Sequence, residues 1–368
     1  MDIEVDKPRV LIFSLRNIYG TAHFRCPHFE FEDIICEIDS ADLLAPKLDP
    51  SSARASFATR LGFHAPVALN PGIQRISPKK RYDILFTICG HPQDLIMFNA
   101  VSNLKDSCAI SVCLLDELWV REIPLRRHFL RLLAKFDVVM LYYSQTVKPL
   151  SEAIGRRCVF MSPGVDAISF CPYPNPPKRV VDVLSIGRRS QITHQKLLKL
   201  VQQDGIFYLH DSIAGIQNLN SKEHRALFAN CAKRTRYFIV NPGLIDQPEK
   251  RGNQIEIGNR YFEGAASGAI MVGERPDNEY FPTLFDWPEA VTHLPYNSNE
   301  IDVVMRDLDR DPERQERIRR TGVSEALKRH DWAYRWERIL ETVGLQPMPE
   351  MQERKDRLRR LAEVVSQN

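Results

Sequence analysis

The stretch "SFCPYPNPPKRVVDVLSIGRR", residues 169–189, contains both a break in the chain and the start of a new run of regular structure. Its first half carries four prolines, which exclude a regular helix or a central strand because proline has no backbone N–H to donate. Its second half is a nearly continuous apolar run that ends at Gly187. We therefore interpret residues 169–179 as an extended linker and residues 180–187 as the first strand of a second domain.

Short apolar runs alternate with longer amphipathic stretches on both sides of this linker. The runs expected to form strands are residues 9–15, 34–38, 82–88, 108–115, 136–143 and 158–162 before the linker, and 180–187, 205–210, 236–242, 269–273 and 290–296 after it. Such alternation is typical of a parallel sheet with helices on both faces. We therefore predict an α/β protein with two Rossmann-like, doubly wound domains that face an interdomain cleft.

The chain of 368 residues is long enough for two domains of ordinary size. The predicted divisions are a first domain at residues 1–168, the linker at 169–179, a second domain at 180–324 and a final segment at 325–368. The final segment has the pattern of charged helices, which we expect to pack back across the domains. It also carries an apolar stripe with basic neighbours, formed by Leu358, Leu361 and Val365, so peripheral contact with an anionic membrane is the alternative.

The composition is typical of a soluble globular protein. Hydrophobic residues make up 43% of the chain, and 50 basic side chains nearly balance 47 acidic ones, which gives no electrostatic footprint for nucleic acid. The eight cysteines contain no C-x-x-C pair and indicate reduced, mostly buried thiols. The start of the chain is acidic where a signal peptide would be basic, and no apolar run is long enough to span a membrane, so we expect a cytoplasmic protein.

A candidate anion site follows the first strand of the second domain. Gly187 ends that strand and would let a ligand approach the backbone, while Arg188 and Arg189 follow where a helix would begin. His194 lies further along the same helix and would add positive charge. A diphosphate fits such a site. Two solvated arginines on a turn are the alternative, and the residues alone leave both interpretations open.

A second candidate site surrounds "RYFEGAASGAIMVGE", residues 260–274. Glu256, Arg260, Glu263 and Ser267 recur at helical spacing and would share one helix face. An ordinary surface ladder of ion pairs explains that spacing. The small residues of "GAASG" are unusual for a solvent-facing helix, and they suit the close approach of another backbone or of a ligand. Glu263 is therefore either a surface charge or a ligand contact.

Two titratable residues follow predicted strands of the first domain. His91 comes after the strand at 82–88, and Asp116 comes after the strand at 108–115. Either side chain is suited to act as a general base, because histidine titrates near neutrality and a carboxylate can be tuned towards it. A role as a helix cap or a hydrogen-bonding partner is the alternative for each.

Together, these segments resemble a known family. The segments "SPGVD" (162–166), "SIGRR" (185–189) and "RYFEGAASGAIMVGE", in a chain with paired Rossmann-like halves, look like a GT-B glycosyltransferase of the retaining family 4 type, or group 1. The tail "RHDWAYRWERIL" (329–340) is similar to that of CgeB-like bacterial polysaccharide transferases. The specific motifs lie in the second half of the chain, whereas the first half is matched by its alternation alone.

The resemblance implies roles for individual residues of the second domain. Arg188 matches the basic residue that binds the donor diphosphate, and His194 or Arg189 would replace a lysine that the family usually has. Glu263 matches the glutamate that binds the nucleotide ribose, while Glu256 lies one residue away from the position of a second family glutamate. The predicted donor-binding residues are Gly187, Arg188, Arg189, His194, Glu256, Arg260 and Glu263, and the predicted catalytic residues are His91 and Asp116.

The resemblance also implies the reaction. The second domain would hold a nucleotide-diphosphate sugar as donor substrate, and the first domain would hold a saccharide, lipid-linked or small-molecule acceptor. No cofactor or metal is expected, because arginine and a helix N-terminus can stabilise the leaving diphosphate. A sugar-nucleotide epimerase of the same fold and a non-catalytic GT-B partner protein are the alternatives.

Overall fold

The computed structural model of the chain describes residues 8–20, 22–49, 70–78, 80–211 and 220–367. Contacts divide the chain into two compact units. The first consists mainly of the residues up to Ser162 and of Trp336–Met351, and the second mainly of Pro163–Arg335 and the residues from Gln352 onward. The proline-rich segment at 169–179 thus belongs to the second unit, and the C-terminal segment contributes to both.

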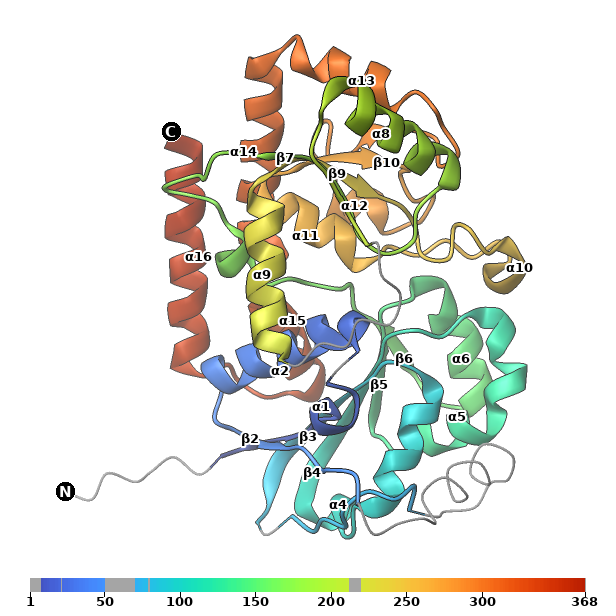
Figure 1. Cartoon of the computed structure of the whole chain (residues 1–368). Coiled ribbons are helices and arrows are strands. Elements are labelled where there is room, and N and C mark those ends of the chain that lie inside the picture. Colours follow the sequence, from blue (N-terminus) through green and yellow to red (C-terminus); the bar gives the residue numbers. More distant parts are fainter. Residues whose placement is uncertain (1–7, 21, 50–69, 79, 212–219, 368) are drawn as a thin grey trace, which may run out of the picture. The chain divides into compact units, whose positions relative to one another are not determined.

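The first unit contains a six-stranded parallel sheet in the order β2-β1-β3-β4-β5-β6 (Figure 1). Its strands are β1 (Val10–Phe13), β2 (Ala41–Leu44), β3 (Tyr82–Cys89), β4 (Cys108–Leu115), β5 (Val138–Leu141) and β6 (Cys158–Phe160). Its α-helices are α1 (Arg16–Tyr19), α2 (Cys26–Ile38), α4 (Leu104–Ser107), α5 (Arg127–Leu133) and α6 (Val147–Ile154). Short 3-10 turns are η1 (His23–Arg25), η2 (Pro92–Ala100), η3 (Val120–Glu122), η4 (Pro124–Arg126) and η5 (Ser144–Thr146).

Residues 34–38, predicted as a strand, form the last part of α2 instead, so that prediction was wrong. Phe31, Ile34, Ile35 and Ile38 are all buried. Their spacing places them on one helix face, where an apolar stripe can pack against the sheet. A short apolar run fits a helix end as well as a strand, and here the longer helical period decides.

The second unit contains a five-stranded parallel sheet in the order β11-β10-β9-β7-β8. Its strands are β7 (Val181–Ser185), β8 (Tyr208–His210), β9 (Thr235–Val240), β10 (Ile270–Gly273) and β11 (Thr292–His293). Its helices are α7 (Ala167–Phe170), α8 (Gln191–Asp204), α9 (Ser221–Lys233), α10 (Pro248–Arg251), α11 (Asn259–Ser267), α12 (Phe281–Leu284), α13 (Ile301–Asp309) and α14 (Pro312–Arg329). The predicted α/β class, with two doubly wound sheets, is confirmed.

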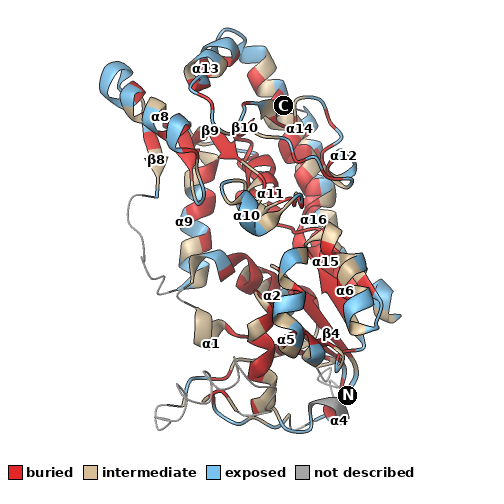
Figure 2. Ribbon diagram, turned by 90° about the vertical axis from the view of Figure 1, so that its right-hand side faces the viewer, coloured by how far each residue is buried: buried red, intermediate tan, exposed pale blue. Residues whose placement is uncertain are grey.

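The C-terminal helices, α15 (Trp332–Val343) and α16 (Pro349–Gln367), are anchored by buried side chains (Figure 2). Leu358 and Val365 of α16 are fully buried in the apolar core of the second unit, and Leu361 packs against the same core. The stripe that suggested membrane contact is therefore covered by protein. None of the helices in the described ranges is long and apolar enough to span a membrane.

Candidate functional site

The carboxyl edge of the second sheet is the natural place for a ligand. Strands β7 and β9 are neighbours, and from β7 the chain first passes outward to β8 before returning to β9. Ligands of open α/β sheets bind at such a reversal of strand order, outside the carboxyl ends of the strands. The residues that follow β7 are Gly187, Arg188 and Arg189, so the sheet topology puts the predicted anion-binding turn at this point.

A small hollow of about 10 Å³, with room for about one water molecule, lies at this edge. Its lining includes residues of β7, β8 and β10, residues after β9 and β11, and the first turn of α8, whose N-cap Ser190 accepts a hydrogen bond from the Thr193 backbone N–H. Polar groups that converge in one hollow at a switch point are typical of a ligand site. The lining residues include Ser185, Arg189, Ser190, Thr193, His194, Tyr208, Asn241, Gly273 and Tyr296.

The two arginines after Gly187 point to different partners. Arg188 forms an ion pair with Asp246 at 3.2 Å, and its side chain is 45% exposed. Arg189 lines the pocket and donates from Nη1 to the backbone oxygen of Asp211 at 2.6 Å. Gly187 has a φ of +92° and nothing within 4 Å of the place where a Cβ would lie. Its backbone N–H is already engaged, because it donates to an Asp211 carboxylate oxygen at 2.5 Å. Both guanidinium groups are thus at least partly exposed at this edge, and each binds a different partner.

His194 lies in the pocket wall. Its Nδ1 is 3.0 Å from the Tyr208 hydroxyl, and its ring is 4.9 Å from the His210 ring. Burial, followed by the nearby charges of Arg189 and His210, lowers the pKa of His194 below its usual 6.5. This shift opposes a positive charge on His194, and the place of His194 in a diphosphate clamp stays a prediction. A neutral imidazole can still hydrogen-bond.

Glu263 is not a surface charge. It lies in α11 with none of its surface exposed, and its two carboxylate oxygens each accept a hydrogen bond at 2.5 Å, from Arg225 and from Arg260. Burial alone would raise the pKa of Glu263, but the charges of Arg260 and Arg225 outweigh it and hold the pKa below the usual 4.5. The prediction that Glu256 shares a helix face with Glu263 was also wrong, because α11 begins only at Asn259.

The small residues of α11 serve packing. A Cβ on Gly264 would lie 2.7 Å from the Met271 side chain of β10. Gly268 ends the helix with a φ of +63°, a conformation that favours glycine. Of the two explanations for "GAASG", close approach of other parts of the chain therefore holds, and the run itself gives no evidence of a ligand.

Glu256 lies in the loop before α11 and is 1% exposed. Its Oε1 accepts a hydrogen bond from Gln254 at 2.8 Å, and Asn278 donates to its Oε2 at 3.5 Å. Asn278 also donates to the backbone oxygen of Ile255. The carboxylate thus organises the loop that leads to α11, and the sequence-based expectation of a donor contact for Glu256 stays a prediction.

The first unit places His91 and Asp116 at the carboxyl ends of the adjacent strands β3 and β4. The His91 Nδ1 is 3.9 Å from a Glu117 oxygen, and an Asp116 oxygen is 2.7 Å from Nε2 of the buried His28. The two candidates therefore have different partners. His28 was missed by the sequence analysis because it lies 88 residues before Asp116, and no local pattern links them.

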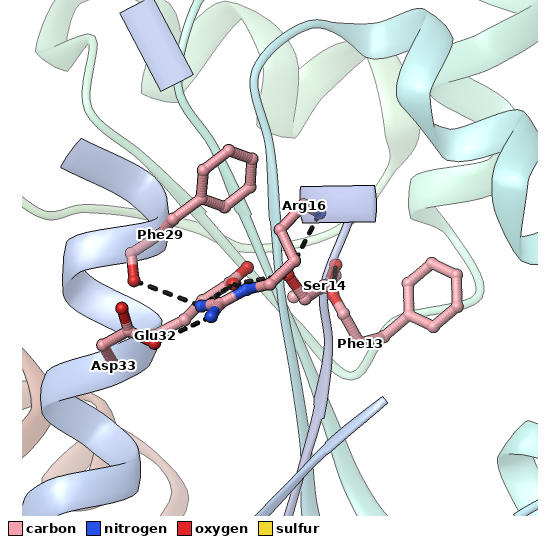
Figure 3. Close-up of polar contacts among 7 residues, drawn as sticks. Phe13, Ser14, Arg16, Phe29, Glu32 and Asp33 are labelled. Atoms are coloured by element: carbon pink, nitrogen blue, oxygen red, sulfur yellow. Dashed lines mark hydrogen bonds and ion pairs between the residues drawn. The ribbon is translucent and has the colours of Figure 1, made fainter. Parts of the chain in front are cut away.

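Ser14, directly after β1, belongs to a second network that the sequence analysis missed (Figure 3). Glu32 of α2 accepts hydrogen bonds from the Ser14 hydroxyl at 2.5 Å and from Arg16 at 2.9 Å, and Arg16 also pairs with Asp33 at 2.8 Å. Burial, only partly offset by Arg16, Ser14 and His28, raises the pKa of Glu32 above 4.5. Side chains of the protein itself thus fill this end of the first sheet.

Comparison with known proteins identifies the fold. Residues 195–341 match a family model described as "Glycosyl transferase-like". A glycosyltransferase from Rickettsia africae ESF-5 aligns over 92% of this chain and 98% of its own, with 11% identity and a TM-score of 0.51. An alpha,alpha-trehalose-phosphate synthase (UDP-forming) from Burkholderia vietnamiensis aligns over 92% and 97%, with 10% identity and a TM-score of 0.53. An alpha-glucosyltransferase in complex with UDP-glucose and DNA aligns over 91% and 99%, with 12% identity and a TM-score of 0.51.

At these identities the likeness shows the fold, which is that of the GT-B glycosyltransferases. No curated protein sequence matches the chain. The resemblance deduced from the sequence is therefore confirmed for the fold, and the matched family model adds a glycosyl transferase-like region that includes most of the second sheet.

Proposed function

We propose that this chain, a GT-B protein with a glycosyl transferase-like region, transfers a sugar from a nucleotide-diphosphate donor to an acceptor hydroxyl, with retention of anomeric configuration. The donor would bind the second unit. The acceptor would be a saccharide, a lipid-linked sugar or a small molecule, and we expect the reaction in the cytoplasm as part of polysaccharide assembly. Two of the aligned structures support a nucleotide-diphosphate sugar as the donor. One is a UDP-forming synthase, and the other is an alpha-glucosyltransferase in complex with UDP-glucose.

The observation that carries this proposal is the turn after β7. Gly187 leaves free space where a side chain would lie, and Arg188 and Arg189 bring two positive charges to the point where the strand order reverses. A pocket with Asn241 and Tyr296 in its lining lies at the same edge. Guanidinium groups make strong charge-assisted hydrogen bonds with phosphate oxygens, and they stay charged at every physiological pH.

The chemistry requires this charge at the leaving group. The acceptor oxygen forms a bond to the anomeric carbon while the bond from that carbon to the diphosphate oxygen breaks. The nucleoside diphosphate leaves with the electron pair, and the acceptor proton passes to a base or to the leaving phosphate. Arginines aimed at the diphosphate stabilise the negative charge that develops there.

The roles of His91 and Asp116 as catalytic bases stay predictions. Asp116 already bonds to His28, whereas His91 keeps 29% of its side chain exposed and has Glu117 nearby. Of the two, His91 has the more exposed side chain, since that of Asp116 is 21% exposed. Among the described residues no three His, Cys, Asp or Glu side chains gather to hold a metal ion. That the reaction needs no metal and no cofactor also stays a prediction.

The test is incubation with UDP-, GDP-, ADP- and dTDP-sugars, with and without oligosaccharide acceptors, followed by measurement of released nucleotide and of the sugar product. Release that depends on the acceptor, with the anomeric configuration kept, is the expected result. Interconversion of the sugar nucleotide without an acceptor would identify an epimerase instead. Absence of binding to every nucleotide would favour a non-catalytic partner protein.

A further inference from the structure

The contacts of Glu263 do not fit a residue that grips a ligand itself. Both of its carboxylate oxygens are engaged by guanidinium groups, and the residue has no exposed surface. A carboxylate that binds a ribose must present its oxygens to the ribose hydroxyl groups. Glu263 would have to lose an arginine and become exposed before it could do so.

The two arginines that hold Glu263 differ in their access to solvent. Arg225 of α9 has only 7% of its side chain exposed, and its guanidinium carbon is 4.9 Å from the centre of the Phe170 ring. Arg260 keeps 33% of its side chain exposed and lies over the Phe228 ring at 4.7 Å. Arg225 is therefore the internal partner, and Arg260 is the one that can reach a ligand.

Arg260 also has donors to spare. A guanidinium carries five N–H groups, and Arg260 directs Nη1 at Glu263. In the part of the chain that the structure describes, no other oxygen accepts a hydrogen bond from this guanidinium. Arg260 is the second residue of α11, and that helix follows Gly258, whose missing Cβ would meet nothing within 4 Å.

The topology places this group at the same edge of the sheet as the candidate site. Helix α11 connects β9 to β10, two adjacent parallel strands, so its N-terminus lies at the carboxyl edge of the sheet, as does the turn after β7. The positive end of the helix dipole and the Arg260 guanidinium both favour an anion there.

We infer that Glu263 is a positioning residue that fixes Arg260, and that Arg260, not Glu263, contacts the donor at its diphosphate. The inference rests on the proposed function, because the anion is the diphosphate of the sugar donor. In this role Glu263 does not make the ribose contact that the resemblance implied. Its buried carboxylate instead holds the Arg260 guanidinium in a fixed position and orientation. Arg225 secures the other oxygen of the same carboxylate.

The experiment is a set of binding measurements on the full chain by calorimetry. The probes are the nucleoside diphosphate that binds best in the panel above, the same nucleoside without phosphates, and the 3′-deoxy form of the diphosphate. The variants are Glu263→Gln, Arg260→Gln and the double variant. Asp182→Asn is the matched control, because it removes an ion pair with Arg236 near the opposite end of β7.

We expect Arg260→Gln and Glu263→Gln each to weaken diphosphate binding by about tenfold or more, the size of a charge-assisted hydrogen bond. The double variant should bind no more weakly than the weaker single variant, since both changes remove one interaction. Binding of the nucleoside alone should stay within about twofold of wild type. Removal of the 3′-hydroxyl from the diphosphate should reduce its affinity by the same factor for wild type and for Glu263→Gln.

Two results would overturn the inference. If the loss caused by removing the 3′-hydroxyl disappears in Glu263→Gln, then Glu263 binds the ribose directly. If Arg260→Gln keeps full diphosphate affinity, Arg260 does not contact the donor, and this test holds even where Glu263→Gln fails to fold. Failure of the proposed function has a different signature, because wild-type protein would then bind none of the nucleoside diphosphates.

Discussion

Glu32 in the first unit and Glu263 in the second are both buried, and the two carboxylates have opposite electrostatic situations. Glu32 in the first unit has one arginine partner and a serine hydroxyl, and its pKa is raised. Glu263 in the second unit has two arginine partners, and its pKa is lowered. Burial penalises both charges similarly, so the number of guanidinium groups decides the sign.

The comparison also shows a different balance of charge beside the two carboxylates. In the first unit, Arg16 is shared between Glu32 and Asp33, so acids outnumber the arginine that serves them. In the second unit, two arginines share Glu263, and Arg188 and Arg189 stand at the same sheet edge. The group around Glu263 thus has one more guanidinium than carboxylate, which is the reverse of the group around Glu32.

The largest expected effect is on stability, and it should separate the two glutamates. Glu263→Gln leaves two arginines without their carboxylate, and breaking a buried pair in this way costs about 3–5 kcal/mol of unfolding free energy. Glu32→Gln should cost at most about 1 kcal/mol, because Arg16 keeps Asp33. Urea unfolding at neutral pH measures both. Equal losses for the two variants would contradict the comparison.

The pH dependence should have opposite signs for the two carboxylates. A lowered folded-state pKa means that Glu263 stabilises the fold above its unfolded value of 4.5 and loses that effect as the pH falls through the folded pKa. A raised folded-state pKa means that the contribution of Glu32 is full below 4.5 and is lost as the pH rises through the folded pKa.

Unfolding free energies of wild type and of both Gln variants, measured in steps from about pH 3 to pH 7, test these signs. The difference in unfolding free energy between wild type and Glu263→Gln should become smaller as the pH falls. Wild type should lose stability relative to Glu32→Gln as the pH rises. Two parallel curves would show that the buried charges do not differ in this way.

A smaller free-energy change is expected at Arg188, and it should affect binding and not folding. Arg188→Ala removes a largely exposed ion pair with Asp246, worth about 0–1 kcal/mol to stability. The same change should weaken nucleoside diphosphate binding by about 1.5–3 kcal/mol, the range for a hydrogen bond to a charged group. Calorimetry with UDP and its relatives measures this, with Asp182→Asn as control. Unchanged affinity would remove Arg188 from the site.

The smallest changes probe the two open glycines of the second unit. Gly258 has ordinary negative φ and free space beside it, but it is the N-cap of α11, where alanine is less favourable than glycine, so Gly258→Ala should change stability by at most about 1 kcal/mol. Gly187→Ala has the same free space but a φ of +92°, and it should cost about 1–2 kcal/mol. If a donor approaches either backbone, the added methyl group will also reduce nucleotide affinity, which a titration of each variant would reveal.

Several features of this protein follow from local sequence patterns. Strands such as β3, β4, β7 and β9 lie within predicted apolar runs, because side chains buried on both faces of a parallel sheet must be apolar throughout. The proline-rich segment lies outside every helix and strand except α7 at its start, since proline lacks the donor that both need. The turn after β7 was found because its residues directly follow a strand.

The predictions that failed depended on where elements begin and on what packs against them. Spacing put Glu256 on the helix of Glu263, but that helix starts only after Gly258. Spacing also made Glu263 appear to be on a solvated face, because its partner Arg225 lies 38 residues earlier on another helix. Helical periodicity says which residues share a face and does not say what covers that face.

The sequence by itself determined the fold class, the turn that carries Gly187, Arg188 and Arg189, and the position of an acid in front of a run of small residues. These features are local, since they depend on side-chain periodicity and on the backbone freedom of glycine and proline. Only the tertiary structure decided that Glu263 is buried between two arginines, that His194 lies against Tyr208 and His210, and that the pKa of Glu32 shifts in the opposite direction to that of Glu263. Burial and charge pairing depend on residues brought together from distant parts of the chain, and both act on a charge through the low dielectric constant of the protein interior.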